Sequence, residues 1–300
     1  MKMRHLILLV VAVLVLQACE DQVDVQLEDA PEALVVDAWV NNKDEVQVIN
    51  ITKTQPYFDG SEPAGVSGAS VTITDENGVD YDFNETSPGV YEWDPAGNPL
   101  PSDLLDYTLT INAEGQNYQA TSSMNRVPAI DSLVFTFKEE RNPFQPEGYY
   151  GEFVAQDPVG AGDSYWIKSY KNGQYLNRPF ELNIAYDAGF NAGGNIDGVV
   201  FIQPIQDAVN PLNDELDAVV PYEPGDSLYV EIHSISNEAF FFLQEVQIQT
   251  QRDGGFDEIF AEPLENVATN IVNVSDTPTT EVVGFFSISA VSSAGKRLEE

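Results

Sequence analysis

Apolar and polar residues alternate along much of the chain, which is the pattern of β-strands with one buried face. Residues 69–74 (ASVTIT) place Ala, Val and Ile on one face and Ser and Thr on the other. Asn77-Gly78 then supplies the positive φ angles of a tight hairpin turn, and residues 79–83 (VDYDF) resume the alternation. About seven such runs within residues 33–127 predict an antiparallel β-sandwich.

The alternation changes phase once in this first region. Apolar residues occupy positions 46 and 48 and then positions 49 and 51. An extra residue inserted into one strand of an antiparallel pair shifts the phase in this way. We therefore expect a β-bulge between Val48 and Ile49.

A second β-rich domain is expected over residues 130–300. Its boundary is placed at residues 126–129 (RVPA), because Pro128 forces the preceding residue into an extended conformation and cannot donate to a sheet. Lys171-Asn172-Gly173 predicts a hairpin turn. Strand patterns recur near residues 151–156, 164–170, 198–206, 227–234 and 282–292. The predicted fold class is mainly β, with two tandem β-sandwich-like domains.

One α-helix is expected in the second domain, near residues 236–251. Ser236 is a favourable N-cap, and Glu238 suits the positive end of the helix dipole. Asp253-Gly254-Gly255 is expected to end the helix. An apolar stripe with helical spacing and the aromatic run 240–242 (FFF) favour packing in the core over a ligand platform.

The N-terminus has the pattern of a secretion signal, for which we assign residues 1–18. Lys2 and Arg4 precede an apolar run of eleven residues, 6–16 (LILLVVAVLVL), which is too short to span a bilayer as a helix. Leu16-Gln17-Ala18-Cys19 follows and resembles a bacterial lipobox. Cys19 is the one cysteine of the chain, so we expect it to be lipidated.

Residues 19–32 are expected to form a lipid-anchored acidic tether. They are rich in acids and lack a strong apolar pattern. Glu20 and Asp21 directly after the cysteine are similar to the signal that exports Bacteroidota lipoproteins to the cell surface. A solvated spacer explains the same acids, so both readings stay open. The expected location is the outer membrane, on the cell surface.

Charge and composition exclude several classes of function. The chain has 13 Lys and Arg against 49 Asp and Glu, a formal net charge of −36. Without residues 1–18 it has 11 bases against 49 acids, a net charge of −38. This balance excludes a binder of the nucleic-acid backbone, which needs clustered bases. A single cysteine excludes a disulfide framework and a thiolate zinc site.

The sequence offers little for catalysis, and we predict no enzyme and no catalytic residues. A nucleophile triad needs a base, and His233 is the one histidine outside residues 1–18. His233 lies in a strand pattern, where a packed or half-exposed histidine is the more common occurrence. Paired carboxylates are unavoidable by chance among 49 acids, so they do not identify a glycosidase.

We expect no cofactor and no bound metal, with one segment to be tested for calcium. Asp187, Asn191, Asn195 and Asp197 offer hard oxygen ligands at loop spacing. The segment lacks the acidic pattern and terminal Glu of an EF-hand loop. A flexible Gly/Asn-rich loop explains it equally.

Two short motifs are candidates for O-glycosylation. Asp131-Ser132-Leu133 and Asp226-Ser227-Leu228 resemble the Bacteroidota signal of Asp, then Ser or Thr, then an apolar residue. The sites would be Ser132 and Ser227. A turn that begins a strand explains both motifs as well.

Two resemblances to known families follow from the order of these features. Residues 68–93 resemble the transthyretin-like, carboxypeptidase-regulatory-like sandwich, which fits the assignment of residues 33–127. The order of features along the whole chain resembles Bacteroidota lipoproteins of domain of unknown function 4249. These features are the lipobox, residues 66–69 (VSGA), the strand after Gly225, the helix and residues 284–287 (GFFS).

The second resemblance implies a role at the outer membrane. The resemblance implies an accessory protein placed beside a TonB-dependent transporter, with no accepted catalytic residues to carry over. The expected function is therefore a non-enzymatic accessory binding or assembly partner of a TonB-dependent outer-membrane receptor. The alternative is an adhesive or structural cell-surface β-sandwich module without a transport role.

Overall fold

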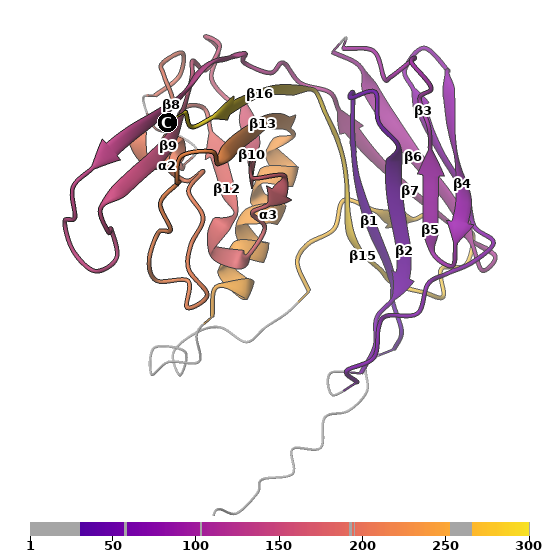
Figure 1. Cartoon of the computed structure of the whole chain (residues 1–300). Helices are drawn as coiled ribbons and strands as arrows, with labels where there is room; N and C mark the ends of the chain where they lie inside the picture. Colours follow the sequence, from indigo (N-terminus) through magenta and orange to yellow (C-terminus); the bar gives the residue numbers. More distant parts are fainter. Residues whose placement is uncertain are drawn as a thin grey trace, which may run out of the picture. The chain divides into compact units, whose positions relative to one another are not determined.

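The nine strands of the larger sheet form a single hydrogen-bonded path in the computed structural model (Figure 1). The structure describes residues 31–56, 59–102, 104–191, 194, 196–252 and 266–299. The strand order is β14-β7-β6-β3-β4-β5-β2-β1-β15. The strands are β1 (Leu34–Asn41), β2 (Gln47–Lys53), β3 (Ser70–Asp75), β4 (Asp80–Ser87), β5 (Val90–Trp93), β6 (Asp106–Ala113), β7 (Gln116–Ser123), β14 (Val272–Asn273) and β15 (Val282–Ser289).

Strand β4 joins the two halves of this sheet. Its first residues pair with β3, and its last residues, from Asn84, pair with β5. β4 changes partner between Phe83 and Asn84, and its pairing with β5 then has a register shift between Glu85 and Ser87. Inward residues of both halves share one apolar core, so the sheet folds back on itself as a sandwich. The expectation of a mainly β fold is confirmed.

The predicted bulge in β2 is wrong. Gln47, Ile49 and Ile51 all point inward, and Val48 is on the exposed face, so the alternation is unbroken. The Gln47 amide is buried because its Oε1 accepts from the Asn41 N–H at 2.9 Å and its Nε2 donates to the Glu45 carbonyl at 3.0 Å. The apparent phase change arose from a polar residue in a core position.

Strands β14 and β15 lie within residues 130–300, yet they belong to the sheet of residues 33–127. Strand β15 pairs with β1 in parallel over eight residue pairs, from Leu34 with Val282 to Asn41 with Ser289. Strand β14 pairs with β7. The chain passes from β15 through Ala290 directly into β16 (Val291–Arg297), which belongs to the second sheet. The two β-rich regions are therefore not consecutive in sequence, because the last segment of the chain returns to the first sheet.

The second sheet has β10, β13 and β16 as neighbours, with β11 and β12 on the other edge of β10. The hairpin β8–β9 forms a separate two-stranded sheet, and α2 contacts β9. One apolar core contains residues from the hairpin, α2 and the second sheet. The elements are β8 (Ile130–Lys138), β9 (Gly148–Ala155), β10 (Ser164–Lys171), β11 (Gln174–Tyr175), η1 (Pro179–Glu181), β12 (Asn183–Tyr186), α2 (Gln203–Asp207) and β13 (Ser227–Ile235).

The expected strand over residues 198–206 is wrong. Helix α2 begins at Gln203, and from the stretch before it Val200 forms an isolated bridge with Gln156. Pro204 lies in the first turn, where its missing N–H costs nothing. The hairpin at Asn172-Gly173 is confirmed, since both residues have positive φ between β10 and β11.

The predicted helix is α3 (Asn237–Thr250). Ser236 is its N-cap, and the Ser236 hydroxyl accepts from the Ala239 N–H at 3.1 Å. Ala239, Phe240 and Leu243 are buried against the second sheet and β15, as the apolar stripe indicates. Its expected Gly-rich end lies outside the described residues.

Among the described residues, none of the helices is long and apolar enough to cross a membrane. Cys19 and most of the tether also lie outside the described residues.

Candidate functional site

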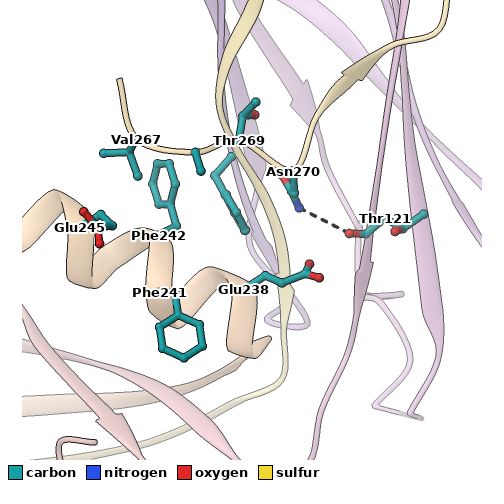
Figure 2. A pocket seen from close by; sticks show the side chains of 10 residues that line it. Thr121, Glu238, Phe241, Phe242, Glu245, Val267, Thr269 and Asn270 are labelled. Carbon is teal, nitrogen blue, oxygen red and sulfur yellow. Dashed lines mark hydrogen bonds between the residues drawn. The ribbon is translucent and has the colours of Figure 1, made fainter. Parts of the chain in front are cut away.

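A recess of about 420 Å³ lies beside α3 (Figure 2). One wall is the outer face of the helix, and the other is the segment before β14 together with β7 and β15. Its lining residues are Thr121, Glu238, Phe241, Phe242, Glu245, Val267, Ala268, Thr269, Asn270 and Phe285. The volume is within the range of ligand pockets, roughly 300–1,000 Å³.

The helical repeat places four lining residues on one face of α3. Glu238, Phe241, Phe242 and Glu245 stand at positions i, i+3, i+4 and i+7, which lie above one another on a helix. Phe242 packs on Phe285 with ring centroids 4.6 Å apart, so it is fixed in the wall. Phe241 is 48% exposed. The expectation of core packing holds for Phe240 and Phe242, but not for Phe241.

Asn270 holds the opposite wall in place. Its Nδ2 donates to the Phe286 carbonyl at 2.8 Å, and its Oδ1 accepts from the Phe286 N–H at 3.0 Å. The side chain thus pairs with β15 as another strand would. A longer contact of 3.4 Å reaches the Thr121 carbonyl. The apolar recess is therefore preformed rather than built from an unattached loop.

The rim of the recess is acidic. Glu238 and Glu245 are exposed, and the structure gives neither carboxylate a hydrogen bond or an ion pair with any described residue. None of the ten described lining residues is basic. The sequence of α3 shows the two acids spaced around aromatic residues. It does not indicate that Phe285 and Asn270 form the opposite wall.

A buried polar chain lies elsewhere, where β13 meets β15. His233 Nε2 is 3.0 Å from Glu231 Oε2, and His233 Nδ1 is 3.1 Å from Ser289 Oγ. Because the ionised Glu231 only accepts, Nε2 holds the proton and Nδ1 accepts from the Ser289 hydroxyl. Lys43 Nζ donates to the other oxygen of Glu231 at 2.5 Å.

This Ser–His–Glu order matches the order of a nucleophile triad, but its surroundings differ. Ser289, His233 and Glu231 are exposed by only 5%, 4% and 2%. None of them lines a recess described here. The Ser289 hydroxyl is therefore buried at the junction of β13 and β15, where its hydrogen bond with His233 links the two strands.

Acid is expected to destabilise the protein through this buried chain. Burial lowers the pKa of His233 to about 4. Burial alone would raise the pKa of Glu231, but hydrogen bonds from His233 and Lys43 lower it to about 2. The unfolded chain takes up a proton on histidine below about pH 6.5, whereas the folded protein resists it until about pH 4. The free energy of unfolding should thus fall between pH 6.5 and 4, by about 3 kcal/mol.

Denaturant unfolding at each pH checks this expectation, with His233→Gln as the comparison. The variant should be less stable at pH 7 and should lack the part of the decline that lies between pH 6.5 and 4. Glu231 contributes its own loss below about pH 4.5, as its unfolded carboxylate begins to protonate. Equal slopes for the two proteins between pH 6.5 and 4 would contradict a buried neutral His233.

The structure brings two of the four calcium candidates together. Asp187 and Asp197 lie in a group with Asp157, with one oxygen of each within 4.8 Å of the others. Asn191 is exposed, and Asn195 lies outside the described residues. Sequence reasoning missed Asp157, because it precedes Asp187 by 30 residues and Asp197 by 40 and lies in a different loop. Carboxylate oxygens in such a group are ligands that a divalent cation accepts.

Hydrogen bonds already hold part of this acidic group. Asp157 accepts from the Tyr165 hydroxyl at 2.6 Å and from the Gly198 N–H at 3.0 Å. Asp187 accepts from the Gly162 N–H at 2.7 Å and from the Asp163 N–H at 3.1 Å. Burial raises the pKa of Asp157, and the nearby acids raise it further against these hydrogen bonds. These hydrogen bonds connect the loops that carry Asp157 and Asp187 to neighbouring backbone and side chains.

The two glycosylation candidates differ in their surroundings. Ser132 is exposed in β8. Ser227 begins β13 and is half-buried, and its N–H donates to Asn172 Oδ1 at 2.8 Å. Ser227 is therefore already hydrogen-bonded through its backbone N–H to Asn172 of the hairpin turn between β10 and β11.

The fold and the recess define a mainly β protein with a preformed, acid-rimmed apolar recess beside its one long described helix. The model of the family described as "Domain of unknown function (DUF4249)" matches residues 20–294. The chain belongs to this family, which confirms the resemblance to domain of unknown function 4249. No curated protein matches the chain.

Proposed function

We propose that the protein is a lipid-anchored, non-enzymatic outer-membrane lipoprotein that acts as a binding or assembly partner of a TonB-dependent transporter. The observation that carries the proposal is Cys19, the one cysteine of the chain, directly after Leu16-Gln17-Ala18. A thiol at this position accepts a diacylglyceryl group, and cleavage before it frees an amine for another acyl chain. Two or more chains give stable anchoring.

The described structure supports a binding role. The recess beside α3 presents apolar rings to solvent, together with two acids that pair with none of the described residues. The Ser–His–Glu chain is buried away from solvent, so its hydroxyl is not presented to a substrate. An exposed apolar patch with a polar rim is a common feature of interaction sites on folded proteins.

Affinity purification from solubilised outer membranes tests the proposal. The full chain with a C-terminal tag should bring down a TonB-dependent receptor in near-stoichiometric amount. A tagged lipoprotein of another family, at equal abundance, serves as the control. A preparation that contains the tagged chain without an outer-membrane receptor would overturn the proposal.

Deletion of the gene separates this function from the alternative. Loss of an accessory protein should reduce uptake of the substrate of the co-purified receptor. An adhesive or structural module, which two β-rich regions on an acidic tether also suit, would leave uptake unchanged and alter surface attachment.

A further inference from the structure

The recess beside α3 has a specific chemistry. Its floor is aromatic, with Phe242 fixed against Phe285 and Phe241 half-exposed. Glu238 and Glu245 stand on either side of these rings, seven residues apart on the helix. With a rise of about 1.5 Å per residue, the two acids are about 10 Å apart along the helix axis.

We propose that this recess is the docking site for a segment of a protein partner in which apolar side chains lie between two basic residues. The inference rests on the proposed function only in that the occupant is a protein. On a helical segment, positions seven apart lie on one face and about 10 Å apart along the axis, so bases at i and i+7 match the separation of Glu238 and Glu245, with apolar residues at i+3 and i+4 between them. The apolar residues between the bases then face Phe241 and Phe242.

Charge complementarity selects this occupant over the others. The chain has a net charge of −36, so a second copy would be repelled. Residues 253–265 of the chain itself contain five acids and no base, which makes them an unfavourable partner for Glu238 and Glu245. A basic segment gains from both carboxylates at the rim while its apolar side chains are removed from water.

A peptide titration tests the proposal on the full chain bearing Cys19→Ala, which is expected to be soluble. The probe is a 14-residue helix-forming peptide with Lys-Ala-Ala-Leu-Phe-Ala-Ala-Lys at its centre. One matched peptide has Glu in place of both Lys, and another has Ser in place of Leu and Phe. The first peptide should bind at least ten-fold more tightly than either of the others. A photo-reactive benzoyl group on the Phe should cross-link to Phe241 or Val267.

Charge reversal at the rim gives the sharper result. Glu238→Lys with Glu245→Lys should weaken binding of the Lys peptide about ten-fold or more and create binding of the Glu peptide. Phe241→Ser should weaken binding of the Lys peptide while both rim charges remain. The matched control is Glu139→Lys with Glu140→Lys, an exposed pair outside the recess that changes the net charge equally.

The outcomes separate docking from general attraction. Equal loss in the control pair, or equal binding of the Ser-substituted peptide, would show attraction to an acidic surface and overturn the proposal. Cross-links outside the recess would also overturn it. Receptor co-purification without peptide binding would leave the proposed function standing, whereas peptide binding without a receptor would leave the docking site standing.

Discussion

Replacing Cys19 with alanine is expected to yield an exported protein that is absent from the membrane fraction. Each buried methylene of an acyl chain contributes about 0.8 kcal/mol, so the loss of two or three chains removes tens of kcal/mol of insertion energy. No other apolar run after residue 19 approaches the roughly 20 residues of a spanning helix. The net charge of −38 without residues 1–18 also repels the body from anionic headgroups.

Fractionation after high-salt and carbonate washes measures the effect. Cys19→Ser is the matched variant, because it keeps a small polar side chain but lacks the thiol that forms the thioether. Both variants should appear in the soluble fraction, and mass spectrometry should show acyl chains on the wild-type protein alone. If Cys19→Ala resists the washes after verified removal of its signal peptide, the lipid anchor is refuted.

Local patterns predicted the elements whose pairing is also local. The alternation of β3 and β4 and the turn at Asn77-Gly78 are in neighbouring sequence, and the structure pairs these two strands directly. Only Gly78 has positive φ there, because the Asp75 side chain accepts from two turn N–H groups and the loop is one residue longer than a two-residue turn. Helix α3 could be predicted from the sequence because the N-cap residue Ser236 and the helical spacing of the apolar residues both indicate a helix over the same residues.

Long-range pairing could not be predicted from the same patterns. The strand pattern of β15 is clear, but its partner β1 lies almost 250 residues earlier in the chain. The inward position of Gln47 could not be predicted for a related reason. It depends on hydrogen bonds of its amide with the Asn41 N–H and the Glu45 carbonyl, which alternation of apolar residues does not reveal. Helix α2 differs, since Pro204 was a visible sign against a strand over residues 198–206.

The candidate sites show the same division. The helix-borne half of the recess, Glu238 to Glu245, follows from helical spacing alone. The other half depends on β15 joining the first sheet, which places Phe285 and Asn270 opposite α3. The acidic group likewise required Asp157 from a separate loop.

Gly284→Ala is expected to be the most damaging single-methyl substitution in β15. Gly284 has a φ of +95°, and a Cβ there would lie 2.0 Å from the Val36 carbonyl oxygen. Val36 is the residue paired with Gly284 in the parallel ladder, so neither backbone can move without loss of pairing. Overpacking and a strained φ each cost about 1–3 kcal/mol, so together we expect about 3–5 kcal/mol.

Two other glycines separate the causes of this loss, with denaturant unfolding as the measurement. Gly68 has a φ of +76° but open space around a Cβ, so Gly68→Ala should cost about 1–2 kcal/mol. Gly60 has neither a positive φ nor a close neighbour, so Gly60→Ala should change stability by less than about 0.5 kcal/mol. A Gly284→Ala protein no less stable than Gly68→Ala would contradict the close approach of β15 to β1.

Because β15 places Phe285 in the recess wall, Gly284→Ala should also weaken binding of the Lys peptide, whereas Gly68→Ala should not.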